Sequence, residues 1–93
     1  MINAFVLIKA RPDSIAEMAP AIAALEGVRE AHSVAGSETD IMVVVTVPDH
    51  AAVAEVVTEQ IVMIPGVLDT RTMIAFRSYS EAQLDATYEN FGD

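Results

Sequence analysis

The chain nearly repeats itself, and this repeat limits its possible folds more than any other feature. In each copy an apolar run leads to a Pro-Asp pair, and a helical pattern then ends at a Gly-Val pair. The Pro-Asp pairs are Pro12-Asp13 and Pro48-Asp49, and the Gly-Val pairs are Gly27-Val28 and Gly66-Val67. Asp is a suitable helix N-cap and Gly a suitable C-terminal stop. Each copy therefore predicts strand, helix, strand, and the chain predicts the order βαββαβ.

The four predicted strands are of two kinds. We expect them at about residues 2–10, 28–35, 40–47 and 67–77. The first and third are apolar on both faces, which is typical of strands in the middle of a sheet. The second and fourth carry polar residues, which indicates edge strands. This pattern predicts an α+β, ferredoxin-like sandwich, with an antiparallel sheet of order 4-1-3-2 and both helices on one face.

The predicted helices each present one apolar stripe. The first stripe is Ile15, Met18, Ile22 and Leu25, and the second is Val53, Val57, Ile61 and Ile64. Pro20 lies inside the first helix and should kink it, because it removes a backbone donor. A third, C-terminal helix is expected at about residues 80–91, where Ser80 and Gln83 form a capping box.

Two helices cover only one face of such a sheet. The other face is apolar in the two central strands, and a monomer would expose it to water. A second copy is the simplest cover, since two sheets pack well face to face in a symmetric dimer.

Length and charge set further limits. The chain has 93 residues, which predicts a single domain over 1–93 with a core at about 2–77. Its net charge of −9 repels phosphate, so we expect no direct contact with nucleic acid. No apolar run is long enough for a membrane span, and the absence of cysteine fits a reducing cytoplasm. No metal-binding, cofactor or catalytic motif is present, so we expect no metal, no cofactor and no enzyme.

Two features could carry a ligand. Gly36, Ser37, Glu38, Thr39 and Asp40 connect the second and third strands. They form either an ordinary hairpin, with Gly36 supplying an unusual turn conformation, or a loop whose N–H groups hold a carboxylate while Glu38 or Asp40 holds an ammonium. Thr70 and Thr72 share one face of the last strand, with Arg71 on the other. They reflect either plain strand propensity or a pair of hydroxyls in a pocket.

Taken in order, these segments resemble a known family. The run GVREAHSVAG, the Asp that follows it, and the later run IPGVLDTRTMIAF are similar to the effector domain of Lrp/AsnC regulators, called the RAM domain. The resemblance covers about residues 2–77. It implies a ferredoxin-like fold, a dimeric α+β barrel-type assembly through the open sheet face, and higher rings such as octamers.

The same resemblance implies a site and a function. Amino acids or related molecules would bind between dimers, near the hairpin and the last strand. The matching positions are Gly36, Asp40, Thr70 and Thr72, and Ser37, Glu38 and Thr39 are included as loop residues. The chain has no room for the family's N-terminal helix-turn-helix, so we expect a stand-alone RAM protein that modulates transcription indirectly, through self-association or a full-length Lrp/AsnC regulator.

Two alternatives stay open. One is a dimeric α+β barrel enzyme, such as a cofactor-free monooxygenase, which has the same strand–helix order. The other is a purely structural oligomerisation domain.

Overall fold

The computed structural model describes residues 1–79, and the predicted helix at 80–91 lies outside them. A four-stranded antiparallel sheet has the order β2-β3-β1-β4, which confirms the predicted arrangement with the two doubly apolar strands in the middle. The strands are β1 (Ile2–Ala10), β2 (Val28–Ser33), β3 (Ile41–Val47) and β4 (Val67–Ile74).

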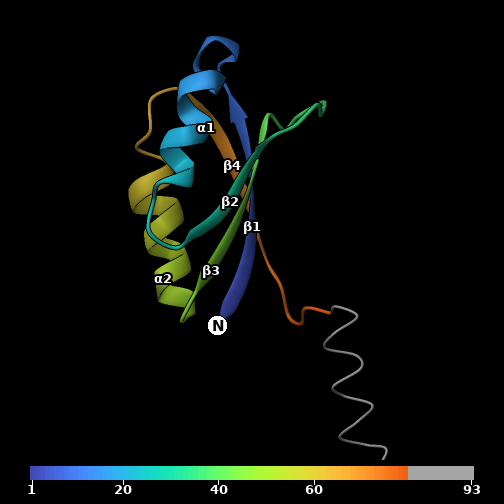
Figure 1. Cartoon of the computed structure of the whole chain (residues 1–93), viewed down its shortest axis with the longest axis vertical. Coiled ribbons are helices and arrows are strands. Elements are labelled where there is room, and N and C mark those ends of the chain that lie inside the picture. The colour runs from blue at the N-terminus through green and yellow to red at the C-terminus, as the bar shows by residue number, and fades with distance from the viewer. Residues whose placement is uncertain (80–93) are drawn as a thin grey trace, which may run out of the picture.

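The helices form a single layer on one face of this sheet (Figure 1). A 3₁₀ turn, η1 (Pro12–Ser14), precedes α1 (Ile15–Ala23). The second helix begins as α2 (His50–Ala54) and continues directly as the π-helix η2 (Glu55–Ile61). Among residues 1–79, no helix is long and apolar enough to cross a bilayer.

The core lies between the helices and the two central strands. Alternate residues of β1 and β3 are fully buried there, as are Met18 and Ile22 from α1. The predicted helix residues Ile15, Leu25 and Ile64 are only partly buried and pack against the margin of this core. The buried residues of β1 and β3 are Ala4, Val6, Ile8, Ala10, Ile41, Val43, Val45 and Val47. The second helix adds Val53, Val56, Val57 and Ile61.

The second helix is wider than the α-helix that its apolar spacing predicts. The N–H of Val62 donates to the carbonyl of Val57, five residues back, at 3.1 Å, which is the π-helical bond. Val56, which was not predicted to be buried, also faces the core. The wider turn brings Val56 and Ile61, five residues apart, to the same side as Val57.

The predicted cap of the second helix is confirmed. Asp49 is the N-cap, and its Oδ1 accepts a hydrogen bond from the backbone N–H of Ala52 at 2.8 Å. This bond satisfies one of the free donors at the helix start.

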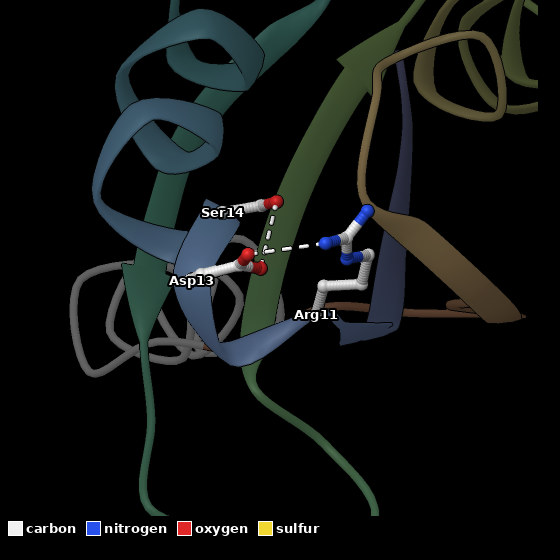
Figure 2. Close-up of polar contacts among 3 residues, drawn as sticks. All are labelled: Arg11, Asp13 and Ser14. Carbon is white, nitrogen blue, oxygen red and sulfur yellow. Dashed lines mark hydrogen bonds and ion pairs between the residues drawn. The ribbon is translucent and has the colours of Figure 1, made fainter.

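The corresponding prediction for Asp13 is wrong. Asp13 lies inside the 3₁₀ turn that begins at Pro12, so the N-cap position falls on Ser14, which makes no side-chain capping bond. Asp13 instead pairs with Arg11 at 3.1 Å and accepts from the Ser14 hydroxyl at 3.4 Å (Figure 2).

The prediction that a glycine ends each helix is wrong, because the helices end at Ala23 and Ile61, with Ala24 and Val62 as C-caps. The two glycines instead lie in the turns directly before β2 and β4, and each packs against the other copy of the repeat. Gly27 and Gly66 have φ values of +92° and +97°. A Cβ on Gly27 would lie 3.0 Å from Val56 in the second helix. A Cβ on Gly66 would lie 2.5 Å from Ser14, at the start of the first helix.

Candidate ligand-binding site

The face of the sheet away from the helices, which we call the open face, has an apolar centre. In the register of the sheet, Phe5 lies opposite Val44 on one side and Met73 on the other, and Leu7 lies opposite Met42. Directly opposite residues share a face, so these five side chains form one apolar patch across three strands. Four of them are half-buried, and Met73 is 53% exposed.

Polar side chains surround this apolar patch. At one end the Thr46 hydroxyl donates to Asn3 Oδ1 at 2.9 Å. Along β2, His32 Nε2 lies 3.4 Å from Glu30 Oε2. An apolar centre with a polar rim is the usual composition of a surface that contacts another molecule.

The hairpin between β2 and β3 closes the remaining end, where it projects away from the helix layer (Figure 1). Its base is fixed by Asp40. The Asp40 N–H donates to the Ile8 carbonyl at 2.8 Å, and its carbonyl accepts from the Val34 N–H at 2.9 Å. Its carboxylate Oδ2 accepts from the Ala10 N–H at 2.8 Å. Asp40 therefore joins the hairpin to the end of β1.

Gly36 does not have the unusual turn conformation expected of it. Within residues 1–79, only Gly27 and Gly66 have positive φ values. A Cβ on Gly36 would instead lie 2.9 Å from the Thr39 carbonyl oxygen. Glycine fits this position because the backbone at residue 36 passes so close to the backbone of Thr39 that a side chain would clash with it.

A small pocket of about 180 Å³ lies where the hairpin meets the open face. The hairpin contributes Glu38, whose Oε2 lies 3.5 Å from Arg71 NH2 on β4. Lys9 and Asp69 face each other across β1 and β4. Two cations and two carboxylates thus surround one apolar residue. The lining is Leu7, Lys9, Glu38, Thr39, Asp69 and Arg71.

Comparison with known proteins identifies the family. The family model for the Lrp/AsnC ligand binding domain matches residues 3–84. The chain belongs to the Lrp/AsnC ligand-binding domain family. An uncharacterized HTH-type transcriptional regulator of Pyrococcus furiosus is 42% identical over 82 residues, which are 85% of this chain and 54% of that protein. The chain therefore spans about half the length of this curated relative.

Solved structures agree with this assignment. TTHA0845 from Thermus thermophilus is 40% identical, with a TM-score of 0.81, over 87% of this chain and 100% of that one. A transcriptional regulator from Neisseria meningitidis, solved as a complex with L-Met, is 20% identical, with a TM-score of 0.75. The match covers 86% of this chain and 53% of the Neisseria meningitidis chain. At that identity the likeness shows the fold alone.

In this Lrp/AsnC domain the predicted site residues of the hairpin separate into three groups. Glu38 and Thr39 line the pocket, whereas Gly36 and Asp40 shape and hold the hairpin. Ser37 is exposed and lies outside the pocket lining.

The two threonines face the other way. Thr70 and Thr72 lie opposite Ile8 and Val6, two core residues, so their side chains are on the helix side of β4. Within one protomer the structure does not bring them to the hairpin pocket.

Four pocket residues were missed in the sequence: Leu7, Lys9, Asp69 and Arg71. The available signal was strand parity, because Asp69 and Arg71 share the face opposite to the threonines. Recognising Lys9 and Leu7 needed the register between β1 and β4 as well, and a single sequence does not fix that register.

Proposed function

We propose that this Lrp/AsnC ligand-binding domain senses a small, amino-acid-like molecule at the hairpin pocket. We further propose that binding is coupled to association of the chain through its open face. The observation that carries the proposal is the pocket lining, which offers partners for both charged groups of an amino acid. Lys9 and Arg71 are donors for a carboxylate, and Glu38 and Asp69 are acceptors for an ammonium.

The size of the pocket supports a small ligand. Its volume is about 180 Å³, and an engineered protein cavity of about 150 Å³ accommodates benzene. Leu7 supplies an apolar contact for the ligand's side chain. The Neisseria meningitidis regulator of the same fold was solved with L-Met, a ligand of the class that we propose here.

Association through the open face follows from its apolar patch. Phe5, Leu7, Met42, Val44 and Met73 would be covered by the same surface of a second copy. Leu7 belongs to both the patch and the pocket, so a ligand and a partner would meet at a shared boundary. A ligand that binds one assembly state more tightly shifts the population toward it. Higher rings and association with a full-length Lrp/AsnC regulator remain predictions.

We favour a sensor over an enzyme because the family model that matches residues 3–84 is that of a ligand binding domain.

A thermal-shift screen of the twenty amino acids, followed by calorimetry, tests the proposal. Binding to the folded state should raise the apparent Tm by mass action. Lys9→Gln should weaken binding, whereas Arg29→Gln, an exposed change outside the pocket lining, should not. If no amino acid raises the Tm of the wild-type protein, the structural oligomerisation domain becomes the better interpretation.

A further inference from the structure

We propose that the ion pair between Glu38 and Arg71 opens when ligand binds and selects α-amino acids with uncharged side chains. In this exchange the ligand carboxylate replaces Glu38 on Arg71, and Glu38 accepts from the ligand ammonium. The inference rests on the proposed function and names the ligand class and the two residues that determine it.

The position of the pair in the sheet supports the exchange. Glu38 belongs to the hairpin between β2 and β3, and Arg71 belongs to β4, so their contact spans β1. Leu7 is the residue of β1 directly opposite Arg71. The ion pair therefore closes over the apolar part of the pocket, where a ligand would have to separate it.

The exposure of the pair makes it easy to separate. Its Oε2–NH2 distance is 3.5 Å, and the Glu38 and Arg71 side chains are 70% and 68% exposed. Ion pairs that are this accessible contribute little to stability, because water and salt screen them. A ligand carboxylate can compete for the Arg71 guanidinium, which can offer it two parallel donors.

Glu38 is the carboxylate of the hairpin that is available for this role. Asp40 is already bound to the Ala10 N–H at 2.8 Å and holds the hairpin in place. Glu38 lines the pocket, and within residues 1–79 its ion pair is with Arg71. Once the ligand takes Arg71, Glu38 can turn to the ammonium without disturbing the hairpin base.

The charge balance of the lining points to a neutral ligand. Lys9 and Arg71 are matched by Glu38 and Asp69. A zwitterion keeps this balance after the exchange, because it brings one charge of each sign. A ligand with a second carboxylate or ammonium leaves the occupied pocket with a net charge.

Calorimetry with three molecules of the same skeleton tests the exchange. L-Leucine carries both charged groups, 4-methylpentanoate lacks the ammonium, and 3-methylbutylamine lacks the carboxylate. We expect Glu38→Gln to weaken the binding of L-leucine on the order of tenfold or more, because the ligand ammonium loses a charged acceptor. The same variant should bind 4-methylpentanoate more tightly, because the Glu38 carboxylate no longer competes for Arg71. Arg71→Gln should weaken the binding of both L-leucine and 4-methylpentanoate.

The controls separate this inference from the proposed function. Glu17→Gln, an exposed change on α1, should alter none of the affinities, and circular dichroism should show that all variants fold. L-Alanine and L-methionine extend the uncharged probes, and L-glutamate and L-lysine should bind at least about tenfold more weakly than the best of these. If an amino acid binds but Glu38→Gln changes the affinities for L-leucine and 4-methylpentanoate in the same direction, the ion-pair exchange is wrong and the proposed binding site is retained. If no uncharged amino acid binds the wild-type protein, the ion-pair exchange is also wrong. In that case the binding of other amino acids tests the proposed function separately.

Discussion

The carboxylate of Asp40 accepts a hydrogen bond from the backbone N–H of Ala10 at 2.8 Å. Ala10 is buried at the end of β1, where the register with β4 shifts. Asp40→Ala leaves this donor without its charged acceptor. We expect the free energy of unfolding, measured in urea, to fall by about 1.5–3 kcal/mol.

A matched comparison is available in Asp13→Ala. That carboxylate is 69% exposed, and its polar partners within residues 1–79 are the nearby Arg11 and Ser14. Its loss should therefore change stability by less than about 0.5 kcal/mol. Equal stability of Asp40→Ala and wild type would return Asp40 to the role first expected for it, a solvated ligand contact.

The two Pro-Asp pairs of the repeat predict different costs at the helix starts. Asp49→Ala removes the acceptor for the Ala52 N–H, so the unfolding free energy should fall by about 1 kcal/mol. Asp13→Ala removes no capping bond and should cost less. Thermal denaturation of both variants measures the difference, and indistinguishable midpoints would show that the Asp49 cap adds no stability.

Gly66→Ala should destabilise the chain for two separable reasons. The φ of +97° is unfavourable for alanine, by roughly 1–2 kcal/mol, and the new Cβ would lie 2.5 Å from the Ser14 Cβ. In a Ser14→Gly background the second cost should shrink while the first remains. A double-mutant cycle in urea measures this coupling. Strict additivity of the two changes would argue against the steric part.

Association through the open face predicts that Val44→Asp yields monomers. The change puts a charge in the apolar patch, where a partner would have to desolvate it. Thr72→Asp, on the helix side of β4, is the control and should leave association intact. Sedimentation at micromolar concentration distinguishes a monomer of 9.9 kDa from larger species. A wild-type chain that is already monomeric would remove the basis for this prediction.

The sheet could be predicted because burial leaves a strong mark on sequence. The runs around Val6 and Val43 are apolar on both faces, and only central positions tolerate that. Strand ends were predicted less well. β4 was expected to reach residue 77 but ends at Ile74, opposite Ala4 of β1. β1 continues to Ile2, so β4 stops before its partner does. The point where two strands stop pairing depends on their three-dimensional course, which local sequence does not contain.

The site was predicted in part for a similar reason. The hairpin is continuous in the chain, so Glu38 and Thr39 could be selected from composition and family resemblance. Lys9 and Arg71 come from strands that are distant in the sequence. Their meeting depends on register and on how far the hairpin folds over the sheet, which only the three-dimensional arrangement defines. For Thr70 and Thr72 the sequence predicted that both side chains share one face of the strand. It did not predict whether that face is turned toward the helices or toward the open face.

The crossed packing of the two glycines predicts that both halves of the chain unfold together. Gly27 lies in the turn before β2, in the first half of the chain, but packs against Val56 of the second half. Gly66 lies in the turn before β4, in the second half, but packs against Ser14 of the first half. Each half thus supplies the surface on which the other half turns. We therefore expect the duplicated motif to unfold as one unit, and a substitution at either glycine to destabilise both halves.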